Sequence, residues 1–210
     1  MLRCLELLRA LRGATGKENL FAMHPRTKEV LEYLDTTRFE LGKVVEDVPA
    51  RRREERPATD RWSVAEVLQH LSIVESRIVQ MIGGKIAAAK DAGLGPEIET
   101  SPILDSIDRA RITDRSRRAT APDMVQPRSV GDAASIWSAL QQSRASLREA
   151  ILAGDGLALS EVTQQHPVLG LINLYQWIIF VGSHEARHTA QVREIAGEFG
   201  GHSSVAAEAR

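Results

Sequence analysis

The chain has 210 residues, of which 43% are hydrophobic and 26% charged, so it is long enough for one folded domain with short appendages. This composition disfavours an intrinsically disordered chain and a membrane-embedded body. The 27 basic and 28 acidic residues leave a formal net charge of -1. Such a chain has no overall field to attract nucleic acid or an anionic membrane, and we expect neither as a partner. The single cysteine, Cys4, cannot form an internal disulfide, which favours a reducing, cytoplasmic location.

The first 22 residues differ in pattern from the rest of the sequence. Leucines alternate with charged residues there, which does not match the uninterrupted apolar core of a signal peptide. Gly13 and Gly16 interrupt any short amphipathic helix, and a second methionine, Met23, precedes the first regular periodicity. We expect residues 1–22 to be a loosely attached or mis-started extension, residues 23–200 to form the folded domain, and residues 201–210 to be a tail.

Two helices are predicted in the first half of the domain. Apolar residues at spacings of three and four predict a helix over residues 26–47. A second helix is expected to begin at Val64, because Ser63 and Glu66 form a capping-box pattern, and to fade before Gly93. The apolar face of this second helix consists of Val64, Val67, Leu68, Leu71, Val74, Ile78 and Ile82.

A long connection without regular periodicity follows, over residues 93–128. It is longer than ordinary helix connections, and it contains a run of arginines: Arg109, Arg111, Arg115, Arg117 and Arg118. A third helix is expected to start after Ser129, with Asp132 completing a weaker capping box, and to end at Gly154.

The fourth predicted helix has the most apolar sequence. Asn173 and Gln176 form a capping pair at its start, and Gly200 and Gly201 are expected to end it. No segment shows convincing strand alternation bounded by turn residues. The sequence therefore predicts an all-α fold, a four-helix bundle with a long crossover connection between helices two and three that lets these two helices run parallel.

Three of the six histidines are candidate metal ligands. His184 and His188 lie four residues apart in the fourth helix, so they share one face, within about 50° of the centre of its apolar stripe. An unpartnered imidazole in the core costs roughly 1–3 kcal/mol, which a bound metal, or hydrogen bonds to side chains or water, would remove. His70 lies about 80° from the centre of the stripe on the second helix, at its edge, where it can act as a third ligand. Three neutral imidazoles leave coordination positions open for water or substrate.

The segment 184–188 also matches the H-E-x-x-H signature of zincins, in which Glu185 would be the general base. The metzincin extension needs glycine at 191 and histidine at 194, where the chain has Gln191 and Glu194. A di-iron bundle needs two Glu-x-x-His pairs, and only Glu185 and His188 have that spacing. We therefore expect neither a zincin nor a di-iron centre.

Three segments of the chain together resemble the DinB/YfiT-like family of metal-dependent four-helix bundles. They are RWSVAEVLQHL at 61–71 with Glu75 after it, HPVLG at 166–170, and HEARHTAQV at 184–192. The resemblance covers about residues 23–200. It implies an antiparallel four-helix bundle, frequently a homodimer, with a divalent metal held by one histidine of the second helix and two of the fourth. These positions correspond to His70, His184 and His188.

The activity implied by the resemblance is the transfer of a small cellular thiol to an electrophilic substrate, as in bacillithiol S-transferases and mycothiol-dependent isomerases. The metal, with zinc or nickel expected and iron or manganese as alternatives, would lower the pKa of a bound thiol and so supply a thiolate near neutral pH. A hydrolase that uses metal-bound water and a non-catalytic metal-binding stress protein remain the alternatives.

Other polar residues are candidates for supporting the site. Glu75 and Arg144 both lie within apolar stripes and are expected to pair inside the bundle, and Glu185 is a further candidate near the histidines. The arginine run of the long connection either forms a solvated face or binds carboxylates of the thiol. Of the remaining histidines, His166 is expected to be structural, and His24 and His202 to be solvated.

Overall fold

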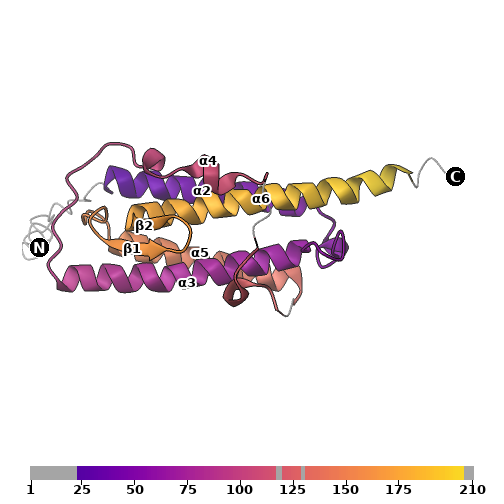
Figure 1. Cartoon of the computed structure of the whole chain (residues 1–210), viewed down its shortest axis with the longest axis horizontal. Coiled ribbons are helices and arrows are strands. Elements are labelled where there is room, and N and C mark those ends of the chain that lie inside the picture. The colour runs from indigo at the N-terminus through magenta and orange to yellow at the C-terminus, as the bar shows by residue number, and fades with distance from the viewer. Residues whose placement is uncertain (1–22, 117–119, 129–130, 206–210) are drawn as a thin grey trace, which may run out of the picture.

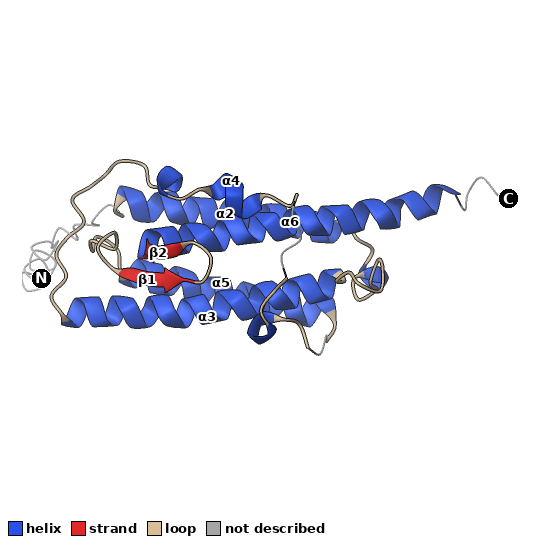
Figure 2. Cartoon of the chain, in the orientation of Figure 1, coloured by secondary structure: helices blue, strands red, loops and turns tan. Residues whose placement is uncertain are grey.

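The computed structural model describes residues 23–116, 120–128 and 131–205, and four long helices dominate it (Figures 1 and 2). These are α2 (Pro25–Glu46), α3 (Val64–Asp91), α5 (Ala133–Ala153) and α6 (Leu174–Val205). The shorter elements are η1 (Ala50–Arg52), η2 (Leu104–Ser106), α4 (Arg109–Thr113), η3 (Asp123–Val125), β1 (Thr163–His166) and β2 (Gly170–Asn173). The prediction of an all-α bundle is confirmed.

The long connection between α3 and α5 sets the topology of the bundle. The colours of Figure 1 show that α2 and α6 run in one direction and that α3 and α5 run in the other. Helix α3 packs chiefly on α5, and α2 packs chiefly on α6. The chain leaves α3 at one end, returns along the bundle through α4, and enters α5 at the opposite end, so α3 and α5 are parallel (Figure 1). This is the predicted crossover.

Local capping explains where the helices begin. The Ser63 hydroxyl accepts a hydrogen bond from the Glu66 N–H at 3.2 Å, and the Glu66 carboxylate accepts one from the Ser63 N–H at 2.8 Å, which completes the predicted capping box. Asn173 and Gln176 form the same reciprocal pair before α6. The predicted start of α5 directly after Ser129 is wrong, because the helix begins at Ala133. Asp132 is its N-cap, and the Asp132 carboxylate accepts hydrogen bonds from the N–H groups of Ala134 and Ser135.

Two further features differ from the sequence prediction. Strands β1 and β2 form an antiparallel hairpin that positions the start of α6; each has only four residues, too few for a period of two to stand out. Helix α6 continues through Gly200 and Gly201 to Val205, because a glycine costs a helix only about 1 kcal/mol and does not by itself end it. Residues 1–22 and 206–210, where the extension and part of the tail are predicted, lie outside the described residues.

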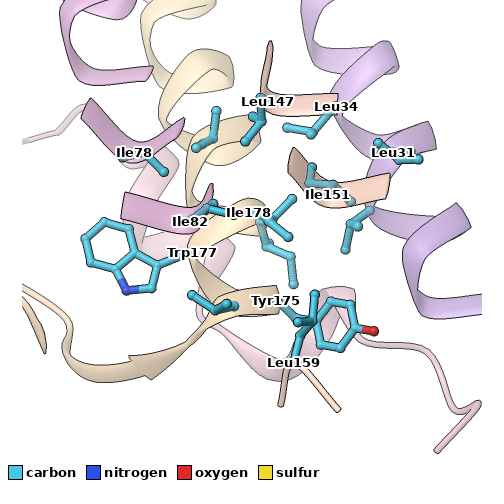
Figure 3. Close-up of a cluster of buried hydrophobic side chains, with 14 of the residues drawn as sticks. Leu31, Leu34, Ile78, Ile82, Leu147, Ile151, Leu159, Tyr175, Trp177 and Ile178 are labelled. Carbon is cyan, nitrogen blue, oxygen red and sulfur yellow. The ribbon is translucent and has the colours of Figure 1, made fainter. Parts of the chain in front are cut away.

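The core has two hydrophobic clusters, one toward each end of the bundle. The first gathers Leu34, Ile82, Leu147 and Ile178 from the four helices, with Tyr175 fully buried beside them (Figure 3). The second contains Leu41, Leu68, Leu140, Val192 and Ile195. Among the described helices, none has the length and apolar composition needed to cross a membrane.

A layer of buried charged residues lies between the two clusters. We call it the charged layer, and it consists of Arg38, Glu75, Arg144 and Glu185, one residue from each long helix. In each helix the charged residue falls between a leucine or valine of one cluster and an apolar residue of the other, for example between Leu140 and Leu147 in α5.

Candidate metal centre

The structure brings the three predicted histidines together between α3 and α6. The Nε2 atom of His184 lies 3.3 Å from Nε2 of His70 and 3.2 Å from Nε2 of His188. One ring nitrogen from each residue lies within 4.8 Å of the other two. His70 and His188 are buried, and His184 is only partly exposed. The angles calculated for these residues on their helices thus correctly predicted that the three side chains can meet.

Hydrogen bonds on the far side of the rings determine which nitrogens carry hydrogen. His70 Nδ1 donates to the Val125 carbonyl at 2.8 Å, since a carbonyl can only accept. His188 Nδ1 lies 2.8 Å from the side-chain oxygen of Gln191, which likewise makes it the donor. In their neutral forms both histidines therefore present a bare Nε2 lone pair to His184, whose single Nε2 can supply at most one hydrogen. A cation among the three nitrogens would satisfy all of them.

Protonation of the three imidazoles does not provide the missing hydrogens at neutral pH. Burial, together with neighbouring imidazoles, places the pKa of His184 well below its usual value, and burial lowers the pKa of His188 to about 3. Burial also lowers the pKa of His70, against the opposing effect of its hydrogen bond to Val125. All three rings are consequently neutral at pH 7, the form in which imidazole binds metals.

The spacing of the nitrogens also suits a metal. Zinc binds imidazole nitrogen at about 2.0–2.1 Å with tetrahedral angles, which places two ligand nitrogens about 3.3 Å apart. The Nε2 atom of His184 lies 3.3 Å from that of His70 and 3.2 Å from that of His188, in agreement with this value. Hydrogen bonds from Nδ1 to a carbonyl or amide oxygen are also the usual support of a metal-binding histidine. The cluster could therefore hold a divalent metal ion.

Aromatic rings cover the histidine cluster on two sides. Trp62 packs against His70 with ring centroids 5.1 Å apart and stacks on His188 at 6.4 Å. Phe180 stacks on His184, with 5.4 Å between centroids and 20° between planes. His166 in turn packs on Phe180, and its Nδ1 accepts hydrogen bonds from two backbone N–H groups of the hairpin turn, which agrees with the structural role expected for it.

The charged layer lies beside this cluster, because Glu185 directly follows His184 in α6. Arg144 donates to both oxygens of Glu75, from Nε at 3.1 Å and from a terminal nitrogen at 3.0 Å, so the predicted pair exists. Arg38 bridges the two carboxylates, with 3.0 Å to Glu75 and 2.6 Å to Glu185. With two arginines and two glutamates, the layer is electrically balanced.

Glu185 is fully engaged in this layer. Its carboxylate accepts hydrogen bonds from Thr37 at 2.7 Å, from Arg38 at 2.6 Å and from Arg144 at 3.0 Å, and only 1% of the residue is exposed. Burial alone would lower the pKa of Arg144, but the charges of Glu185 and Glu75 raise it above its usual value. Glu185 is thus held as the partner of two cations, an arrangement that does not suit the general base of a zincin.

Some residues of the site were missed by the sequence analysis. Arg38 follows Leu34 by four residues and lies about 40° from it on a helical wheel. The angular comparison with the apolar stripe that predicted burial of Arg144 would therefore also have predicted burial of Arg38. Gln191 follows His188 by three residues, the spacing at which helical side chains meet. The Val125 carbonyl gave no signal, because every residue has a backbone carbonyl and the sequence does not show which of them meets a side chain.

Two arginines of the predicted run, Arg109 and Arg115, are paired with carboxylates. Arg109 pairs with Asp105, and Arg115 makes two hydrogen bonds to Glu194 on α6, while positions 117 and 118 lie outside the described residues. His24 is not solvated as expected: its Nδ1 accepts a hydrogen bond from the Arg26 N–H and caps α2. The side chain of His202 lies outside the described part of the chain.

Comparisons with known proteins agree with this architecture. The model of the DinB superfamily matches residues 33–192. The chain is 27% identical over 170 residues to the uncharacterized protein YuaE of Bacillus subtilis (strain 168), an alignment that covers 79% of this chain and 96% of that protein. No solved structure matches the chain. With three quarters of its length matched by the family model, the chain belongs to the DinB superfamily.

Proposed function

We propose that the protein is a metal-dependent enzyme that transfers a small thiol to an electrophilic substrate. The observation that carries this proposal is the convergence of the Nε2 atoms of His70, His184 and His188, which no aspartate, glutamate or cysteine joins among the described residues. Three imidazoles leave part of the coordination sphere of a divalent ion to an outside ligand, the pattern of catalytic rather than structural sites. When bound there, zinc or nickel would act as a Lewis acid that lowers the pKa of a thiol ligand.

The chain itself would contribute orientation and shielding. The Val125 carbonyl and the Gln191 side chain hold the rings of His70 and His188 with their Nε2 atoms inward. Trp62 and Phe180 cover the histidines with apolar surface, which limits access of water to the reacting atoms.

The surroundings favour a thiol over water as the nucleophile. Hydrolysis by a metal-activated water is usually assisted by a carboxylate base, and the nearby Glu185 is occupied by Thr37, Arg38 and Arg144. A thiol has a pKa of about 8.5 before it binds, far below the roughly 15.7 of water, so on a metal it would release its proton to solvent near neutral pH without such a base. The proposal therefore includes a small-molecule thiol and an electrophile as partners, and it extends to a homodimer acting in the cytoplasm.

A thiol-conjugation screen tests the proposal. The purified full chain, loaded with zinc or nickel, is mixed with monobromobimane or 1-chloro-2,4-dinitrobenzene and a panel of small thiols, and adduct formation is followed by absorbance or fluorescence. We expect metal-dependent acceleration that is lost in His184→Ala and retained in His24→Asn, a control that keeps an acceptor at the N-cap of α2. Hydrolysis of ester substrates without any thiol transfer would replace the transferase assignment with the hydrolase alternative.

A further inference from the structure

An open pocket of about 390 Å³ lies between α3 and the segment around η3. It is lined by Gln69, Ile73, Arg77, Met124, Gln126 and Arg128. Gln69 directly precedes His70, and Met124 and Gln126 flank Val125, whose carbonyl accepts the hydrogen bond from His70 Nδ1. The pocket therefore adjoins the segments of α3 and η3 that hold the ring of His70.

Two guanidinium groups make this pocket positively charged. Within the described part of the chain, neither Arg77 nor Arg128 has a carboxylate partner: Arg77 contacts the sulfur of Met124 at 3.8 Å, and Arg128 donates to the backbone carbonyl of Asp123 at 3.4 Å. The carboxylate of Asp123 instead accepts from the Gln126 amide at 3.3 Å. Other arginines around the bundle, such as Arg115 and Arg148, are paired with carboxylates.

We propose that this pocket binds the anionic group, a carboxylate or a phosphate, of the small thiol cosubstrate, an inference that rests on the proposed function above. Guanidinium groups bind both kinds of anion through paired hydrogen bonds. An anion held by Arg77 and Arg128 would replace the missing carboxylate partners, with the side-chain amides of Gln69 and Gln126 lining the same space.

The position of the pocket along α3 fits a molecule with a thiol at one end and an anion at the other. Arg77 follows His70 by seven residues, so the two lie on the same face of the helix. They are about 20° apart around the helix and about 10 Å apart along its axis. A short flexible chain can cover that separation. The anion-binding role that the sequence suggested for the arginine run of residues 109–118 is thereby assigned to other arginines.

The anion site is tested first without metal, so that the result does not depend on the histidines. Metal-free full-length protein is titrated at low ionic strength with hexanoate and, separately, with inorganic phosphate, and binding is followed by calorimetry. We expect Arg77→Gln and Arg128→Gln each to weaken binding about fivefold or more. The control Arg51→Gln, at an exposed arginine of η1, should bind like the wild type.

The two probes distinguish the anion that is recognised: preference for hexanoate indicates a carboxylate, and preference for phosphate indicates a phosphate. Binding of neither probe, or unchanged binding in both pocket variants, overturns the proposal. Because both arginines are exposed, the variants should fold, which circular dichroism verifies.

The link to the histidine cluster is tested with cobalt(II)-loaded protein, whose absorption reports thiol binding. We expect 6-mercaptohexanoate to bind about fivefold or more tightly than the neutral 6-mercaptohexan-1-ol, and Arg77→Gln to abolish the difference. Equal binding of the two thiols contradicts the proposed link. If neither thiol changes the cobalt spectrum while hexanoate or phosphate still binds in an arginine-dependent way, the thiol-transferase function fails and the anion site stands.

Discussion

Replacing Glu185 with glutamine removes one of the two carboxylates that balance two buried arginines in the charged layer. Glu185 accepts hydrogen bonds from Thr37, Arg38 and Arg144, and all three partners are buried. In Glu185→Gln, Arg38 and Arg144 share only Glu75, and the glutamine NH2 group faces at least one N–H donor. The variant thus leaves one uncompensated positive charge in the middle of the bundle.

The loss in the free energy of unfolding can be estimated from the charges and hydrogen bonds that remain in the layer. Breaking a buried ion pair by removing one partner costs about 3–5 kcal/mol. The glutamine carbonyl still accepts one hydrogen bond, so we expect the lower end, a loss of about 3 kcal/mol in the free energy of unfolding. Urea unfolding of the metal-free protein, followed by circular dichroism at pH 7, measures it. The control Asp35→Asn breaks an exposed pair with Arg148 and should cost at most about 1 kcal/mol.

A second substitution tests whether charge balance is the cause. Arg38→Gln combined with Glu185→Gln leaves one arginine opposite one glutamate, so the double variant should be at least about 1 kcal/mol more stable than the sum of the single effects predicts. The single variant Glu185→Gln should contain as much metal as the wild type. Neither the wild type nor Glu185→Gln should cleave peptides. A loss of stability below about 1 kcal/mol would refute the reasoning about the layer. Peptidase activity that disappears in this variant would restore the zincin interpretation.

Three further predictions follow from the histidine cluster and the helix packing. Burial lowers the pKa of His188 to about 3, below the roughly 6.5 of a histidine in an unfolded chain, so the unfolded state binds the proton first. As the pH falls below about 6.5, the free energy of unfolding of the metal-free protein should therefore drop by up to about 1.4 kcal/mol per pH unit through this residue. Urea unfolding at pH 7, 6 and 5 measures this slope, which should be shallower in His188→Asn. Gln191→Ala removes the hydrogen-bond partner of His188 Nδ1 and should weaken metal binding about 10-fold to 100-fold in a competitive chelator titration, where unchanged affinity would exclude a supporting role. Gly182→Ala would place a Cβ atom 2.5 Å from a ring carbon of Tyr33 and should cost about 1–3 kcal/mol in thermal or urea unfolding. Gly83→Ala in α3 would place a Cβ atom with no neighbour within 4 Å beyond the adjoining backbone of its own helix, and it should be neutral or stabilising by up to about 1 kcal/mol.

The sequence carried most of the information on the helices and the histidines, because both follow from helical periodicity. Apolar spacing and capping pairs located the four long helices, and the angle from the apolar stripe placed His70, His184 and His188 on facing surfaces. The same count predicted the Glu75–Arg144 pair. These are properties of one helix at a time, which a single sequence encodes directly.

The features that were missed depend on contacts between distant segments or on backbone groups. The β1–β2 hairpin is short and is stabilised by its packing against α6, with His166 against Trp177 and Phe180. The bond from His70 to the Val125 carbonyl depends on how the long connection folds back on α3. The capping role of His24 was missed because histidine is not among the residues usually found at helix N-termini.

Elemental analysis of the purified chain tests most directly whether His70, His184 and His188 form a metal site. The wild-type protein and the control His24→Asn should each contain about one divalent metal per chain, since three convergent imidazoles form one site. The double variant His184→Ala/His188→Ala keeps a single imidazole of the cluster and should contain none. Full metal content in that double variant would contradict the assignment of the histidine cluster as the metal centre.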